Sequence, residues 1–112
     1  MKLFLEKKKL SDSLEVANTP WKKGMGLRFA PKARPMLFEF EKESHPAFDM
    51  WFVNFTIDTV YLDSHKKIVD LARLKPWTGP VRPEAACKYV VELPKGWIEK
   101  FRIKYGRKMD WK

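Results

Sequence analysis

Glutamine is absent from this sequence of 112 residues, asparagine occurs twice and cysteine only once. The single thiol, Cys87, excludes an intrachain disulfide, and no Cys/His pair has the spacing of zinc ligands. Glycine-rich phosphate loops and the nucleophile elbow of hydrolases are missing as well. We therefore expect no cofactor and no metal, and we expect Cys87 to be an inert core thiol. The scarcity of amides beside abundant Lys and Glu is typical of proteins from hot environments.

Long hydrophobic runs are also missing. No stretch approaches the roughly 18 apolar residues of a membrane span, and the opening MKLFLEKKKL has too few adjacent apolar residues for a signal peptide core. We expect a cytoplasmic protein with no membrane partner. The length fits a single domain over residues 1–112, for which 45% hydrophobic residues provide enough core material.

Negative charge is in the minority, since 23 Lys and Arg stand against 14 Asp and Glu and give a net charge of +9. Such an excess creates a positive field that favours anionic partners. The basic residues are spread along the chain without forming one basic arm. Nucleic-acid binding is therefore possible but not favoured, and the oligomeric state stays open.

Alternation of apolar and polar residues, or apolar residues on both faces, predicts short strands. The segments concerned are residues 3–5, 14–17, 36–41, 47–53, 57–62, 68–74 and 87–93. Residues 7–12 are expected to turn, and residues 109–111 to close the sheet. Two short helices are predicted, one starting at Thr19-Pro20 and one over residues 96–105. We expect a mainly β protein, a small β-sandwich or barrel-like sheet of about seven short strands with two short helices, with α+β as the alternative.

Several segments, taken in order, resemble the domain of unknown function 192 family, also called uncharacterised protein family 0127. They are MGLRF, MLFEF, Met50, IDTVYLD, LKPW and AACKYVVELPKG, which together extend over about residues 14–111. The resemblance implies a compact β-sandwich or barrel-like fold and brings no agreed catalytic residues. Many relatives have Trp-Met where this chain has Asp49-Met50, and Pro where it has Thr56.

One carboxylate, Asp58, lies inside the longest apolar run and shares a strand face with Val60 and Leu62. A charge in the core of a sheet is costly unless it is paired or used. Two interpretations stay open. In the first, Asp58 lines a pocket and anchors a polar ligand. In the second, it caps backbone amides at the kink that we expect at Asn54-Phe55, or pairs with Arg28 or Arg73.

The candidate ligand-binding residues come from the segments that carry the resemblance: Met50, Asp58, Trp77 and Glu92. Trp77 lies in a proline-stiffened loop, where packing demands are weak and an aromatic face is free to stack on a ligand. Our leading hypothesis is a small non-enzymatic ligand-binding or accessory domain, whose ligand is an unknown small molecule or polymer. The first alternative is nucleic-acid binding through a basic surface with exposed aromatics. The second is a hydrolase that uses Asp58 and Glu92 as acid and base, which requires a separation of roughly 5–9 Å.

Overall fold

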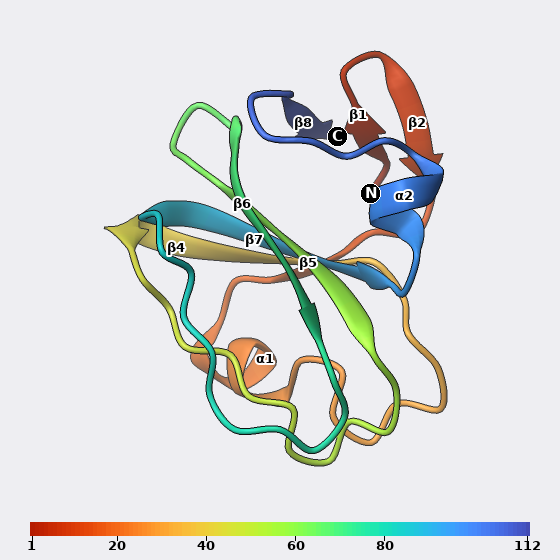
Figure 1. The fold of residues 1–112 in the computed structure, drawn as a ribbon, viewed down its shortest axis with the longest axis vertical. Helices are drawn as coiled ribbons and strands as arrows, with labels where there is room; N and C mark the ends of the chain where they lie inside the picture. Colours follow the sequence, from red (N-terminus) through yellow and green to blue (C-terminus); the bar gives the residue numbers. More distant parts are fainter.

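The computed structural model describes residues 1–112 as two β-sheets with two short helices (Figure 1). The strands are β1 (Leu3–Leu5), β2 (Lys8–Ser11), β3 (Glu15–Ala17), β4 (Met36–Ser44), β5 (Ile57–Leu62), β6 (Ile68–Leu74), β7 (Cys87–Pro94) and β8 (Met109–Trp111). The helices are α1 (Pro20–Met25) and α2 (Trp97–Lys100). The mainly β, sandwich-like fold expected from the sequence is confirmed. Neither helix has the length and hydrophobicity needed to cross a membrane.

The larger sheet has five strands in the order β3-β4-β7-β5-β6, and its neighbours are antiparallel except for the parallel pair β3 and β4. Every residue of β5 is buried, because the strand has a neighbour on each side and is covered on both faces. In the β5–β7 register, Asp58 lies opposite Leu93 and Thr59 lies opposite Glu92. Residues directly opposite each other project from the same face of a sheet.

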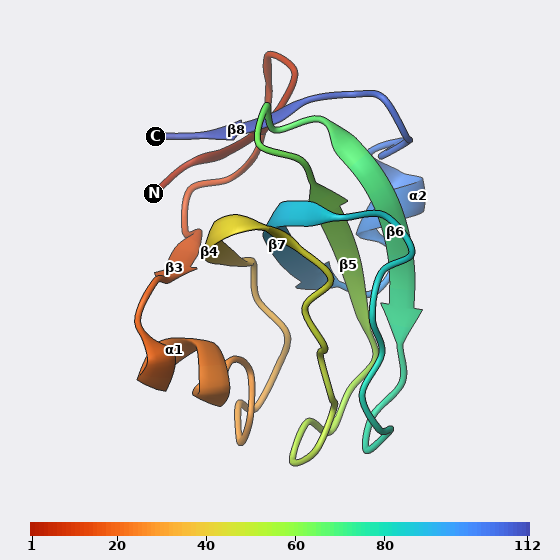
Figure 2. The ribbon, with the colours of Figure 1, turned by 90° about the vertical axis from the view of Figure 1, so that its left-hand side faces the viewer.

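Two cores lie on the two faces of this sheet. Val60 and Leu62 of β5 pack into a core with β1, β2 and β8, which form a three-stranded sheet of order β2-β1-β8. Ile57 and Tyr61 pack into the other core, with residues of β4 and of the loops that follow α1 and β4. Figures 1 and 2 show the small sheet and α2 toward one end and α1 with the long loops toward the other. The parity of a position in β5, and from Val90 to Leu93 in β7, therefore decides which core its side chain enters.

The prediction of a strand over residues 47–53 is wrong. Only an isolated bridge joins Phe48 to Val81, and Phe52 has a φ of +64°, which breaks any extended backbone. The apolar pattern has another origin. Met50 and Val53 point into the core, whereas Trp51 and Phe52 are exposed.

Two smaller corrections concern the ends of the chain. Residues 7–12 do not only turn, since Lys8–Ser11 pairs with β1, and the pattern was missed because Leu10 is its only buried residue. The helix predicted over residues 96–105 ends at Lys100, because Arg102 adopts a φ of +54°.

Candidate functional site

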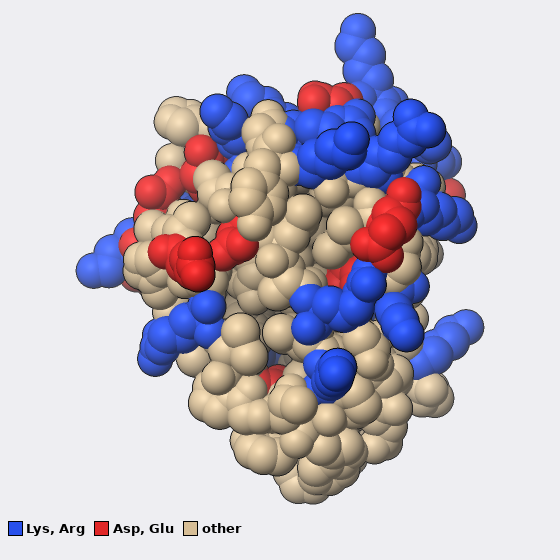
Figure 3. Space-filling model, in the orientation of Figure 1, with Lys and Arg blue, Asp and Glu red and all other residues tan.

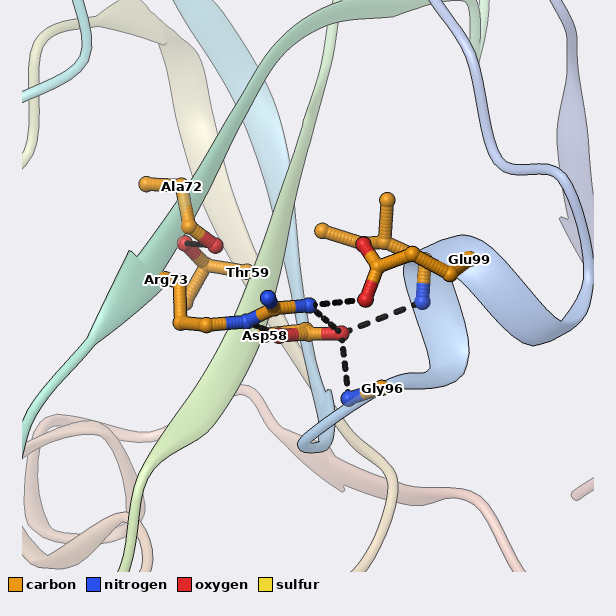
Figure 4. A network of polar contacts seen from close by, with 7 residues as sticks. Asp58, Thr59, Ala72, Arg73, Gly96 and Glu99 are labelled. Carbon is orange, nitrogen blue, oxygen red and sulfur yellow. Dashed lines mark hydrogen bonds and ion pairs between the residues drawn. The ribbon is translucent and has the colours of Figure 1, made fainter.

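Asp58 is fully buried on the face of the five-stranded sheet that α2 covers (Figure 4). Its carboxylate accepts hydrogen bonds from Nε of Arg73 at 2.7 Å, from the amide of Gly96 at 2.9 Å and from the amide of Ile98 at 3.0 Å. Arg73, on the neighbouring strand β6, also contacts Glu99 of α2. Asp58 thus holds the start of α2 against the sheet. Of the interpretations drawn from the sequence, the structure shows the ion pair with Arg73. The amides it caps belong to α2 and not to the kink before β5.

Glu92 lies one residue before Leu93, and therefore on the opposite face of the same sheet. Its side chain is only 5% exposed. No side chain or backbone group of the protein forms a hydrogen bond or ion pair with it. Every side-chain oxygen or nitrogen that is completely buried has a hydrogen-bond partner. The carboxyl oxygens of Glu92 are therefore not completely buried, and they face the open space of a pocket. Burial raises the pKa of Glu92 to about 8, and the charge of Arg28 only partly offsets this rise. At neutral pH most Glu92 side chains hold a proton.

The two acidic candidates therefore cannot act together. Asp58 and Glu92 project from opposite faces of the sheet, so the hydrolase alternative, which needs both carboxyl groups on one substrate, has no site here.

The pocket that contains Glu92 has a volume of about 280 Å³. Its walls come from the end of α1, from β4 and from the loop between β4 and β5, with the residues Lys23–Arg28, Phe38, Phe40, Pro46–Met50, Val53 and Ile57. Met50 is almost completely buried in this wall. Figure 3 shows a hollow in the lower half of the molecule with acidic atoms inside it and basic side chains nearby.

Two cations stand at the rim of the pocket. Arg28 forms an ion pair with Asp49 at 2.7 Å, donates to the carbonyls of Gly24 and Trp51, and so is occupied within the protein. This contact lowers the pKa of Asp49. Lys23 lies over the ring of Phe40, 4.7 Å from its centroid. Neither cation forms an ion pair with Glu92, so its carboxyl group is left without a partner that a ligand could supply.

Trp77 does not reach this pocket. Its indole N–H donates to the side chain of Asn54 at 2.8 Å, and its ring packs edge-on against Phe52. The structure thus brings together Met50 and Glu92, holds Trp77 on an outer loop, and separates Asp58 on the other side of the sheet.

Most of the pocket wall has no signal in the sequence. The sequence pattern indicates Arg28 only as a partner for Asp58, and it does not indicate Lys23 or Phe40 as neighbours of Glu92. No local pattern could have found them, because they come from segments more than 50 residues before Glu92 in the sequence. Cys87 is buried as expected, and burial raises the pKa of its thiol to about 12, which makes it inert at neutral pH.

The model of the DUF192 family, described as an uncharacterized ACR, matches residues 3–111. The chain belongs to the DUF192 family. A UPF0127 protein of Thermococcus sibiricus is 32% identical over 101 residues, which are 88% of this chain and 65% of that protein, so this chain spans less than two thirds of that relative. A UPF0127 protein of Pyrococcus horikoshii is 30% identical over 110 residues, 95% of each chain. The resemblance drawn from the sequence is confirmed.

Two solved structures have the same fold. A protein of unknown function from Novosphingobium aromaticivorans superposes with a TM-score of 0.88 at 19% identity, covering 98% of this chain and 84% of that one. A Sinorhizobium meliloti protein provisionally named a transcription regulator superposes with a TM-score of 0.89 at 18% identity, covering 97% and 91%. At this identity the likeness concerns the fold alone. DUF192 is an uncharacterised family, and it brings no specific function to this chain.

Proposed function

We propose that this protein is a small cytoplasmic ligand-binding domain, without catalytic activity of its own, whose ligand enters the pocket closed by Glu92. The observation that carries the proposal is a buried carboxyl group without a partner in the protein, placed in an otherwise largely apolar pocket. A buried polar group without a partner costs free energy in the empty protein, and a ligand that supplies the partner recovers it. Strongly shifted carboxyl groups in pockets are typical of functional sites.

The chemistry of the pocket favours a small apolar amine. The walls offer aliphatic and aromatic carbon from Met50, Phe38 and Ile57, and a volume of about 280 Å³ limits the ligand to a small molecule. An ammonium group would pair with ionised Glu92, which no cation of the protein contacts. Binding at pH 7 would then release a proton from Glu92 to the solvent, because the charged ligand lowers the pKa of the carboxyl group.

Matched pairs of compounds test this proposal. Benzylamine and cyclohexylamine are compared with benzyl alcohol and cyclohexanol by two-dimensional NMR, and proton release is measured calorimetrically in two buffers of different ionisation enthalpy. We expect amines to shift the amides of β4 and β7 around the pocket and to release about one proton at pH 7. Glu92→Gln should remove the preference for amines, whereas Glu39→Gln, an exposed carboxylate on β4, should keep it.

A preference for the alcohols would retain the pocket and reject the amine. A broad fragment library in which no compound distinguishes the wild-type protein from Glu92→Gln would contradict ligand binding at this site.

A second candidate function, nucleic-acid binding, is favoured by the distribution of charge. Figure 3 shows Lys and Arg gathered over the end of the molecule that carries the three-stranded sheet. The elements there are β2 with the turn before it, the β5–β6 turn, the end of α2 and the chain between α2 and β8, with the basic residues Lys7, Lys8, Lys9, Lys66, Lys67, Lys100, Arg102, Lys104, Arg107 and Lys108. We call this surface the basic end. Some of these charges are already paired within the protein, as in Lys66 with Asp110.

The salt dependence of binding to RNA and DNA duplexes tests this second candidate. Each phosphate that a cation neutralises steepens the slope of log affinity against log salt by close to one. We expect Lys7→Ala combined with Lys104→Ala to reduce that slope, and Lys42→Ala on β4 to leave it unchanged. No binding at about 50 mM salt would exclude nucleic-acid binding by the basic end.

A further inference from the structure

Five aromatic side chains are exposed at the end of the molecule opposite the basic end. They are Trp21, which is 74% exposed, Phe29, which is 68% exposed, and Trp51, Phe52 and Trp77, which are 44–48% exposed. We call this group the aromatic end. It is built from the start of α1 and from the loops α1–β4, β4–β5 and β6–β7, which reach the same end in both views (Figures 1 and 2). Isolated exposed apolar residues are common on proteins, but a cluster of this size marks an interaction surface.

The rings of the aromatic end touch one another. Phe29 stacks on Phe52 with centroids 4.9 Å apart, and Phe52 meets Trp77 edge-on at 5.0 Å. Trp51 and Trp21 line a shallow groove beside Phe29 and Phe52. The result is one continuous apolar surface. Stacking on successive bases requires instead a row of separate rings, each with a free face.

Backbone strain accompanies this exposure. Phe29, Phe52 and Trp77 have φ values of +62°, +64° and +59°, a region that bulky residues rarely adopt. Specific hydrogen bonds hold these conformations, from the amide of Phe29 to the carbonyl of Phe52 and from the amide of Trp77 to the carbonyl of Met50. Strained backbone is common in functional loops, and here it falls on three exposed aromatic residues whose rings contact one another in sequence.

Two of the hydrogen-bonding side chains near this surface are occupied within the protein. The indole N–H of Trp77 donates to Asn54, and the guanidinium of Arg28 is held by Asp49 and by backbone carbonyls. The indole N–H groups of Trp21 and Trp51 have no partner in the protein. An indole with an apolar ring and a free N–H suits the interface of a bilayer, where the N–H can donate to a headgroup oxygen.

The loops of the aromatic end also carry more positive than negative charge. Residues 18–35, 45–56 and 75–86, which contain these loops, hold seven Lys and Arg and only two acidic residues. Figure 3 shows basic side chains above a lower end that is almost free of charge. Aromatic residues partition to the interface of a bilayer, and nearby cations are attracted to anionic headgroups.

From the apolar loop tips, the strained backbone and the cations around them, we infer that the aromatic end docks on the surface of an anionic lipid bilayer. The loops would insert their rings among the headgroups while the sheets stay in water. This differs from the expectation of no membrane partner, which considered only segments that could span the bilayer. It is also independent of the pocket that contains Glu92, since docking uses the outer surface of the loops.

Co-sedimentation with vesicles tests the inference on the whole protein. The vesicles contain equal parts of phosphatidylglycerol and phosphatidylcholine, or phosphatidylcholine alone, in about 0.1 M salt. The variant Phe29→Asn/Phe52→Asn/Trp77→Asn removes the rings and keeps the backbone, because Asn tolerates positive φ. We expect the wild-type protein to bind the anionic vesicles and the triple variant to bind at least tenfold more weakly at an unchanged thermal midpoint. Tyr105→Asn, which removes an exposed ring from the α2–β8 chain at the other end, should bind like the wild type.

Three results would overturn the inference. The wild-type protein could fail to sediment with anionic vesicles, or the triple variant could bind them as tightly as the wild type, which would assign binding to the basic end. In the third, analytical ultracentrifugation would find a dimer that the triple variant dissociates, and vesicle binding would be missing. That result would make a second copy of the chain the occupant of the aromatic end.

Discussion

Two carboxylates, Asp58 and Glu92, are buried on neighbouring central strands of one sheet, and their surroundings are opposites. Asp58 accepts hydrogen bonds from one guanidinium and two backbone amides. Glu92 has no protein partner and opens into a pocket. The carboxylate of Asp58 is thus satisfied by donors of the protein, whereas the carboxyl group of Glu92 is left for a ligand or solvent to satisfy.

The difference follows from a shift of one position along β7. Asp58 pairs with Leu93 and shares its face, whereas Glu92 shares the face of Thr59. Asp58 meets the start of α2, whose amides need acceptors, and Arg73 lies directly across on β6. Glu92 faces α1 and the long loops, which bring carbon and an arginine that is already paired. Burial alone therefore does not identify a functional acid. The more informative property is whether the buried carboxyl group has hydrogen-bond partners within the protein.

The largest expected effect is the pH dependence contributed by Glu92. Its folded-state pKa is raised to about 8 from an ordinary value of 4.5, so between these pH values the folded protein binds a proton that the unfolded chain has lost. Folding stability contributed by this group is complete below pH 4.5 and is lost as the pH rises to about 8. Glu92→Gln, which never ionises, should be more stable than the wild type at pH 9 by on the order of 4 kcal/mol, and should match it at pH 4. Urea unfolding at the two pH values measures the difference, and equal stabilities at pH 9 would show that Glu92 is solvated like a surface acid.

The next largest effect is expected at Asp58. Asp58→Asn replaces one acceptor oxygen by an amide group that faces donors, and removes the charge that holds Arg73 and α2, at a cost of about 3 kcal/mol. Glu99→Gln, which alters only the exposed partner of Arg73, should cost less than about 1 kcal/mol. Denaturation at pH 7 measures both variants. If Asp58→Asn cost no more than Glu99→Gln, the contrast between the two carboxylates would be lost.

The sequence predicts the part of this contrast that depends on residues close together in the chain, and not the part that depends on distant segments. Strand parity in β5 correctly grouped Asp58 with Val60 and Leu62, and the structural interpretation of Asp58 already included Arg73. Both signals are local, since β5 and β6 form a hairpin. The empty surroundings of Glu92 could not be predicted, because they depend on where α1 and the β4–β5 loop pack, and no periodic pattern encodes that.

The β4–β5 loop illustrates the same limit. Residues 47–53 have the composition of a buried strand, yet they form a loop that buries Met50 and exposes Trp51 and Phe52. Composition cannot distinguish an apolar residue held in a core from one presented to a partner. The positive φ of Phe52 breaks the extended backbone, and the carbonyl of this residue accepts a hydrogen bond from Phe29 of the α1–β4 loop, a contact that no local pattern encodes.

A smaller effect concerns the helix that borders the pocket. Gly26 ends α1 with φ +50° and ψ −129°, and a Cβ there would lie 3.4 Å from the ring of Phe38 in the pocket wall. Gly26→Ala should therefore destabilise the protein by about 2 kcal/mol and perturb the NMR signals of the pocket. Gly24→Ala, within the same helix and with no atom within 4 Å of the new Cβ, should stabilise it by about 0.5–1 kcal/mol. Opposite signs for these two glycines are the result to look for in thermal unfolding, and a destabilising Gly24→Ala would mean that α1 packs more tightly than described.

The smallest expected effect is the change in the pKa of Glu92 when the charge of Arg28 is removed. Arg28 is the one cation whose charge lowers the pKa of Glu92, and it does so without touching it, since its guanidinium is bound to Asp49. Arg28→Gln should consequently raise the pKa of Glu92 by a fraction of a unit, as measured by NMR titration of the side-chain carboxyl carbon. Arg34→Gln removes an equal charge from a surface pair with Glu15, and should leave that pKa unchanged. A large rise in the Arg28 variant would mean that Glu92 has a charge partner after all, and the difference between the two faces of the sheet would then be one of degree. A small rise would show that Glu92 has no charge partner in the protein, in contrast to Asp58 on the neighbouring strand, which is fully hydrogen-bonded.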